Sequence, residues 1–281
     1  MGTSASSKGP GSGVSFDPPW LDDIELPYSE PTSPDKPEQP NEQQPIVGKD
    51  EPKVLMVAPP ARFRGAKVNL GNYIKTGDTS SLRRSLGHYS KTGMGGAQRV
   101  ANRMRLSTSV GAGLFRSLQS VREGTNPSLA DLFSKLAANN ADVYQFVDAI
   151  VDNVCPSGGS PDEESCRDSA NYAISGFLNK NPDADISNLS DDALWSLTAS
   201  FLGHEAFSRV QFDIGNTFEK KQVTWQERIS RLKEMREYME AEISAQINKL
   251  RTISGKQSSQ SLRAIFEKTI ENTFRVYEVE V

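Results

Sequence analysis

The chain has 281 residues, of which 36% are hydrophobic and 24% are charged. Because this hydrophobic share is lower than in most globular domains, we expect part of the chain to remain unfolded. No run approaches the ~18 consecutive apolar residues of a membrane helix, and the first residues lack the apolar core of a secretory signal. We therefore expect a soluble, cytoplasmic protein that does not span a membrane.

The net charge of −4 conceals four blocks of very different charge. Counting Lys and Arg against Asp and Glu gives −6 for residues 1–60, +11 for 61–122, −11 for 123–215 and +2 for 216–281. A strongly basic block is thus followed directly by an equally acidic one. This asymmetry is compatible with two interpretations, and the sequence leaves both open.

In the first interpretation the basic block binds nucleic acid, since clustered Lys and Arg release counterions from the phosphates. Such binding would weaken steeply as the salt concentration rises. In the second, the two blocks face each other within the fold or across a subunit contact, where complementary charge sets their orientation. The candidate phosphate-binding residues are Arg62, Arg64, Arg83, Arg84, Arg99 and Arg103.

Residues 1–52 contain most of the prolines of the chain, mixed with Gly, Ser, Glu and Gln. A segment of this composition cannot bury enough apolar surface to offset the entropy that it would lose on ordering. We predict a disordered, Pro/Gly-rich N-terminal arm.

The stretch FDPPWLDDI at residues 16–24 differs from the rest of this arm because it contains large apolar side chains. Apolar anchors of this kind are typical of a short linear motif that docks in the groove of a partner. In that case the partner-binding residues are Trp20, Leu21, Asp22 and Asp23. The alternative is that the stretch folds back onto the protein's own core.

Residues 53–122 form a basic, Gly/Arg-rich region that we expect to be helical. The Ser80-Ser81 pair predicts the start of a helix that ends at Tyr89, and two more helices are expected from Gly95-Gly96 to Leu106 and over residues 109–122. Before them, residues 54–57 (VLMV) lie between prolines and favour a short strand or an extended segment.

Residues 123–281 are predicted to form a helical domain. Apolar residues recur at spacings of three and four after Ser128, over residues 143–151 and after Ser190, while Pro161 with its following acids is typical of a helix start. Five aromatic residues of this region are interpreted as core: Tyr144, Phe146, Trp195, Phe201 and Phe207.

The longest apolar pattern covers residues 224–252 and predicts a long helix of an antiparallel hairpin or coiled coil. A last helix is expected after Gly255. The alternation in residues 276–281 (VYEVEV) then favours a short terminal strand that pairs with residues 54–57. The predicted fold class is mainly α. The apolar stripe of the long helix is Trp225, Ile229, Leu232, Met235, Met239, Ile243, Ile247 and Leu250.

No catalytic arrangement is suggested by residue spacing. His88 and His204 lie far from each other and from the two cysteines, so neither zinc-ligand spacing nor a Cys/His pair is present. Cys155 and Cys166 could form a disulfide across the loop between them, but reduced thiols are favoured in a cytoplasmic chain. We expect a protein that is not an enzyme and holds no metal.

Several stretches resemble the QatB family, a component of the four-gene bacterial Qat anti-phage system. The resemblance is carried by the opening MGTSASSKGPGSG, by PPWLDD at residues 18–23, by PPARFRGA at 59–66, by LRRSLGHY at 82–89 and by Gly95-Gly96. It covers roughly the first 115 residues, and residues beyond about 120 show only the pattern of a generic helical domain.

This resemblance implies a P-loop ATPase, a TatD-like nuclease and QatC as partners. QatC is similar to 7-cyano-7-deazaguanine synthase, a QueC-like enzyme. Relatives of that synthase in defence systems attach a deazaguanine to the N-terminal glycine of a protein. The modified residue here would be Gly2, freed by removal of Met1, with Thr3 and Ser4 in contact with the enzyme.

Two functions are therefore expected. The first is a non-enzymatic defence subunit that carries a covalent 7-deazaguanine derivative on Gly2 and needs no other cofactor. The alternative is an adaptor that binds nucleic acid through its basic region and recruits a defence nuclease.

Overall fold

The computed structural model describes residues 61–139, 142–155, 159–220, 223–251 and 259–281. These residues are mainly helical and contain no strand, which confirms the predicted fold class. The predicted arm at residues 1–52 and the predicted strand at 54–57 lie outside the described residues. Among the helices that the structure describes, none is both long and apolar enough to cross a membrane.

The helices follow one another with short connections. A π-helical turn, η1, separates α3 from α4, and a 3-10 turn, η2, precedes α9. The predicted boundary between residues 122 and 123 falls between α5 and α6. The bounds are α2 Arg64–Thr76, α3 Thr79–His88, η1 Tyr89–Met94, α4 Ala97–Arg103, α5 Arg105–Arg122, α6 Pro127–Ala138, α7 Val143–Val154, α8 Pro161–Lys180, η2 Ile186–Asn188, α9 Asp191–Ile214, α10 Asn216–Lys220, α11 Trp225–Arg251 and α12 Ser259–Glu278.

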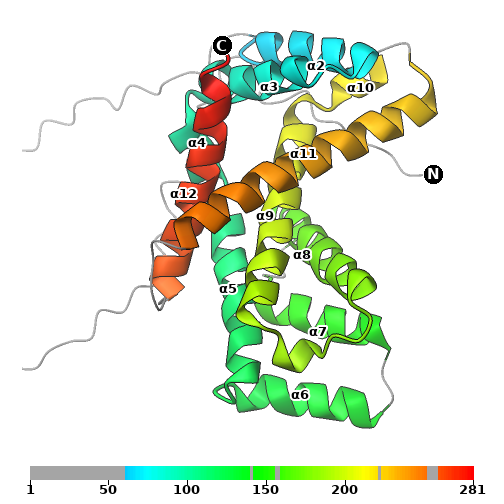
Figure 1. Ribbon diagram of the computed structural model, residues 1–281, viewed down its shortest axis with the longest axis vertical. Coiled ribbons are helices and arrows are strands. Elements are labelled where there is room, and N and C mark those ends of the chain that lie inside the picture. Colours follow the sequence, from blue (N-terminus) through cyan, green and yellow to red (C-terminus); the bar gives the residue numbers. More distant parts are fainter. Residues whose placement is uncertain (1–60, 140–141, 156–158, 221–222, 252–258) are drawn as a thin grey trace, which may run out of the picture.

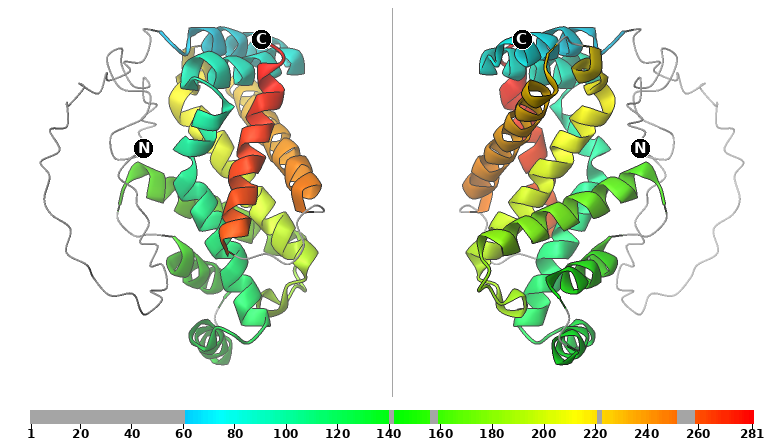
Figure 2. Two further views of the ribbon diagram at one scale, coloured as in Figure 1. Left: turned by 90° about the vertical axis from the view of Figure 1, so that its left-hand side faces the viewer. Right: turned by 90° about the vertical axis from the view of Figure 1, so that its right-hand side faces the viewer.

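The central element is α9, which packs against α5, α8, α10 and α11. Helices α2, α3 and α10 gather at one end of the molecule, and α6 and α7 lie at the other (Figure 1, Figure 2). Because neighbours surround α9, its apolar residues are not confined to one stripe, as expected for a helix in the interior. One hydrophobic core extends from Phe63 to Tyr277.

Polar caps determine where several helices begin. Ser190 accepts a hydrogen bond from the N–H of Ala193 at the start of α9, as the sequence predicted. At α8, Ser160 and Glu163 form a capping box around Pro161. Helix α3 begins at Thr79, one residue before the predicted start at Ser80-Ser81. The cap is Asp78, whose carboxylate accepts hydrogen bonds from the backbone N–H groups of both serines.

The predicted terminal strand is wrong, since residues 276–278 belong to α12. Alternation of Val and Glu suggested a strand, but the side chain that decides is Tyr277, which is fully buried. It continues the helical stripe of Phe266, Ile270 and Phe274, whereas Val279 is 84% exposed. Burial of Tyr277 at helical spacing therefore overrides the local strand preference.

The long helix predicted for residues 224–252 is α11, and α12 runs back across it to form a splayed hairpin (Figure 1). The apolar stripe of α11 is buried only in part. Met239 and Ile243 are fully buried, but Trp225 and Ile229 are 66% and 50% exposed. The core position predicted for Tyr144 is also wrong, because that side chain points into solvent at the surface of α7.

The close approach of α3 and α12 depends on Gly87. A Cβ atom at this position would lie 2.4 Å from the carbonyl oxygen of Tyr277, which is backbone and cannot rotate away. We predict that Gly87→Ala lowers the free energy of unfolding by about 1–3 kcal/mol, the usual cost of overpacking.

The matched control is Gly176→Ala in α8, where a new Cβ would meet no atom within 4 Å. There the better helix propensity of Ala should raise stability by up to ~1 kcal/mol. Urea denaturation of both variants checks the comparison. Equal effects of the two substitutions would contradict the packing argument.

Candidate functional site

A buried cluster of charged side chains lies where α5, α8 and α9 meet. At its centre is Glu205, which has no exposed surface. Its carboxylate accepts hydrogen bonds from Ser107 at 3.1 Å, Ser165 at 3.0 Å and Ser169 at 2.9 Å. The Nε of Arg209, one turn along α9, donates to it at 2.9 Å. A buried carboxylate with this many donors is well satisfied.

The cluster extends to Asp162 in the first turn of α8. Arg103 donates two hydrogen bonds to Asp162, at 2.6 Å and 3.3 Å, and Arg209 forms a further ion pair with it. Burial alone would raise the pKa of Asp162, but the two guanidinium groups outweigh burial and hold this pKa below its ordinary value. Asp162 therefore stays ionised between two arginines.

A second buried acid, Asp213, lies at the end of α9. Burial raises the pKa of its carboxyl group, while the hydroxyl of Tyr89, which donates to it at 2.9 Å, and the nearby arginines act in the opposite direction. One of these arginines is Arg62, whose guanidinium carbon lies 4.8 Å from the centre of the Phe63 ring. Arg62, at the beginning of the described chain, therefore lies close enough to Asp213 of α9 to influence the pKa of that carboxyl group.

His204 lies beside this cluster on α9. Its ring stacks on Tyr172 at 4.0 Å between centres, and its Nδ1 is 3.0 Å from the hydroxyl oxygen of Ser169. Burial, helped by the positive charge of Arg236, lowers the pKa of His204 to about 4. The imidazole is therefore neutral at physiological pH.

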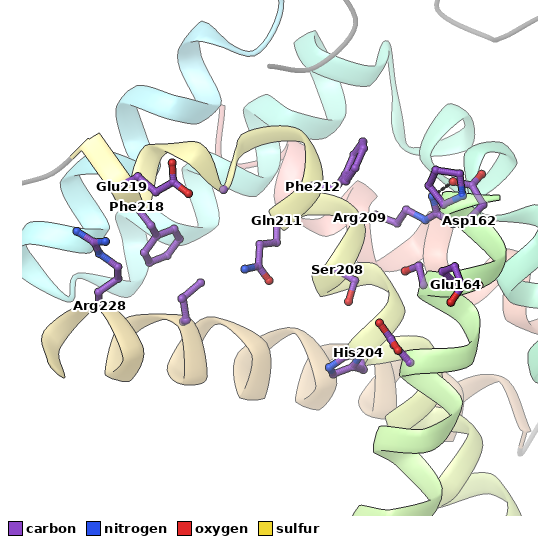
Figure 3. Close-up of a pocket in the computed structure, with 15 residues that line it drawn as sticks. Asp162, Glu164, His204, Ser208, Arg209, Gln211, Phe212, Phe218, Glu219 and Arg228 are labelled. Atoms are coloured by element: carbon purple, nitrogen blue, oxygen red, sulfur yellow. Dashed lines mark hydrogen bonds and ion pairs between the residues drawn. The ribbon is translucent and has the colours of Figure 1, made fainter. Parts of the chain in front are cut away.

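The outer side of the cluster forms the wall of a cleft of about 960 Å³. Figure 3 shows it as an elongated space, with Asp162, Glu164 and Arg209 at one end and Phe218, Glu219 and Arg228 at the other. The cleft combines apolar walls with charged groups, as ligand-binding sites do. Its lining residues are Pro161, Asp162, Glu164, Ser165, Asp168, His204, Ser208, Arg209, Gln211, Phe212, Gly215, Phe218, Glu219, Arg228 and Leu232.

The side chains that line this cleft can form hydrogen bonds, ion pairs and apolar contacts with a ligand.

The two cysteines do not line the cleft. Both are buried free thiols, so they are not joined in a disulfide. Burial raises the pKa of Cys155 to about 11 and that of Cys166 higher still, so neither is a ready nucleophile. Within the described ranges no group of three His, Cys, Asp or Glu residues is placed to hold a metal ion.

The six arginines predicted to bind phosphate have different surroundings. Arg62 is buried, Arg103 is paired with Asp162, and Arg83 forms a 2.7 Å ion pair with Glu280. Arg64 and Arg84 are exposed, and Arg99 is half-buried in α4. The contact of Arg103 with Asp162 and that of Arg122 with Asp191 link the basic block to the acidic one. Nucleic-acid binding by these arginines stays a prediction.

The predicted residues of the arm all lie outside the described residues. They are Gly2, Thr3, Ser4, Trp20, Leu21, Asp22 and Asp23. The sequence alone did not point to the roles of Glu205, Arg209 and Asp213. The signal for the first two was an acid and a base at i and i+4 within a long, largely apolar helix, where an unpaired buried charge would be costly.

A family model described as "Qat anti-phage system associated protein QatB" matches residues 95–277. The match includes the buried cluster from Arg103 onward and the whole cleft. It also covers residues 123–277, for which the sequence pattern indicated only a generic helical domain. Neither the curated proteins nor the solved structures include a match to this chain.

The burial of neutral His204 predicts a dependence of stability on pH. Its pKa falls from 6.5 in the unfolded chain to about 4 in the folded one, so the unfolded state binds more protons between these values. The stability contribution is complete above pH 6.5 and is lost as the pH falls towards 4. Allowing for partial exposure, we expect a loss of about 1–3 kcal/mol.

The control is His204→Gln, which removes this titration and leaves that of the carboxylates unchanged. The unfolding free energies of the two proteins should therefore run parallel above pH 6.5 and converge below it. Urea titrations at several pH values measure both curves. Parallel curves down to pH 4 would show that His204 is not held neutral by the fold.

Proposed function

Because the chain belongs to the QatB family and acts in Qat anti-phage defence, we propose that it is the protein substrate of the QueC-like enzyme of that system. That enzyme joins a 7-deazaguanine derivative to the amine of Gly2. The observation that carries this proposal is the family match together with a glycine directly after Met1. The chain itself performs no reaction.

Gly2 is chemically suited to this role. Removal of Met1 leaves an α-amine with a pKa of ~7.7–8.0, so a sizeable fraction is unprotonated and nucleophilic at neutral pH. The enzyme activates a carboxylate with ATP, and the amine displaces the activating group, forms an amide and loses a proton. Glycine has no side chain to obstruct entry into a deep site, and Thr3 and Ser4 offer small hydrogen-bonding groups behind it.

The separation between Gly2 and the described body supports the same role. Fifty-eight residues, 3–60, lie between Gly2 and the first described residue, Ala61. A flexible chain of this length reaches roughly 40 Å on average. The body can therefore stay bound to other components of the defence complex while Gly2 enters the active site of a partner.

The body then serves as a docking platform. Its charged cleft and its mixed surface are suited to protein partners, of which the P-loop ATPase, the TatD-like nuclease and QatC are the candidates that the family implies. The alternative function, a nucleic-acid adaptor that recruits the nuclease, is supported mainly by Arg64, which is exposed, and by Arg84, which is exposed but lies 3.9 Å from the carboxylate of Asp78. It receives less support from Arg83 and Arg103, which are paired with acids.

We predict that co-expression with the QueC-like partner adds one deazaguanine derivative to the mature chain, on Gly2. Intact-mass and N-terminal peptide spectrometry measure the modification. The matched variant Gly2→Pro still permits removal of Met1 but offers a hindered secondary amine, so it should remain unmodified. An unmodified Gly2 beside a partner that demonstrably consumes ATP would contradict the proposal.

A further inference from the structure

The end of the cleft formed by α8 carries two carboxylates that the described residues leave unpaired. Glu164 and Asp168 lie one turn apart on α8 and both line the cleft, and neither forms an ion pair or hydrogen bond with a described residue. Glu219 and Arg228 belong to the opposite end (Figure 3). Two acids at i and i+4 repel each other unless a cation lies between them. We call this part of the cleft its acidic end.

The arginines near the acidic end are already engaged with other acids. Arg209 is balanced by the buried carboxylates of Glu205 and Asp162. Arg167, on α8 itself, forms an ion pair with Asp152 of α7. These cations are therefore used within the fold, and the two acids of the cleft attract a positive charge from outside the described residues.

The ring of His204 adds a hydrogen-bond acceptor to the same wall. The hydroxyl of Ser169 has one proton, which it donates to Glu205 at 2.9 Å. Its 3.0 Å contact with the Nδ1 of His204 therefore requires that this nitrogen carries a proton and donates. The Nε2 of the neutral ring is then an acceptor, on a residue that lines the cleft. Carboxylates and an imidazole nitrogen together suit an ammonium group, which has three donors.

One segment outside the described residues has the required charge. Residues 1–15 contain Lys8 and no acid, and the amine of Gly2 adds a second positive charge once Met1 is removed. Residues 16–60, in contrast, contain three lysines and ten acids, a net charge of −7. The acidic end of the cleft attracts the first part of this chain and repels the rest.

The point where the chain enters the body brings this segment within reach of the cleft. Arg62, the second described residue, is close enough to Asp213 to influence its pKa. Asp213 lies one turn of α9 beyond Arg209, which lines the cleft. The 58 residues between Gly2 and Ala61 span roughly 40 Å as a flexible chain, and a tether of this kind gives effective concentrations in the millimolar range.

We propose that residues 2–8 dock in cis at the acidic end of the cleft, with the ammonium groups of Gly2 and Lys8 towards the carboxylates of Glu164 and Asp168. This inference rests on the proposed function in that Gly2 begins the mature chain. A docked ammonium group keeps its proton and is shielded from an acylating enzyme, so release from the cleft must precede modification. Amide formation then removes the positive charge of Gly2, and the modified segment is held less tightly by the acids.

The reactivity of the amine tests this proposal in the full-length chain, without the partner enzyme. Limiting N-hydroxysuccinimidyl acetate labels amines that are accessible and unprotonated, and peptide mass spectrometry gives the rates at Gly2 and Lys8 relative to Lys75, which is exposed on α2. We expect Glu164→Gln/Asp168→Asn to raise both rates about threefold, as for a segment that is docked about two thirds of the time.

The matched control is Asp148→Asn/Asp183→Asn, which removes two exposed carboxylates that do not line the cleft. It should leave both labelling rates unchanged. Urea denaturation should show that neither double variant unfolds the chain, since all four side chains are at the surface. Equal labelling rates in the two double variants would overturn the proposal.

Photocrosslinking then locates the contact. With p-benzoylphenylalanine in place of Ser7, we expect crosslinks within one chain to peptides from α8 and α9, which the same residue in place of Gln43 should not give. Crosslinks that miss both helices, or that join only two different chains, would also overturn the proposal. Failure of the QueC-like enzyme to modify Gly2 would contradict the proposed function instead, while labelling and crosslinking would still decide whether the segment docks.

Discussion

The fold depends on the pairing of one buried carboxylate, that of Glu205, which collects donors from three helices. Ser107 comes from α5, Ser165 and Ser169 from α8, and Arg209 from α9 itself. Leaving such a group unpaired would cost several kcal/mol, so only an arrangement that brings all these donors together is tolerated. Buried ion pairs add little net stability in general. We infer that here they select how the helices pack.

This cluster connects the packing of the helices to function. Arg209 and Asp162 belong to the cluster and also line the cleft, so the interior positions the wall of the binding surface. In the same cluster, the ion pair of Arg103 with Asp162 joins the basic block, residues 61–122, to the acidic block, residues 123–215. The result is a firmly packed body that suits the docking role that we propose for this Qat defence subunit, while the proposed reactive group belongs to Gly2, 59 residues before Ala61.

The sequence predicted what local spacing determines and missed what distant contacts determine. Apolar residues at steps of three and four identified α9, α11 and α12, and Ser190 identified the start of α9. The strand predicted around Tyr277 failed because burial against other helices, absent from a local pattern, decides that residue's state. Trp225 fits the apolar stripe of α11, but no described helix covers the first turn of α11, so its side chain is exposed. The partners of Glu205 are up to 98 residues away, a pairing that no local motif encodes.

A double-mutant cycle between Glu205 and Arg209 tests this account most directly. From urea denaturation we expect Glu205→Gln and Arg209→Met each to cost about 3–5 kcal/mol, because each leaves a buried group without its partner. The double variant should then cost less than the sum of the two by ~1–3 kcal/mol. Additive effects, or single effects below ~0.5 kcal/mol, would show that the pairing of Glu205 does not hold the helices together.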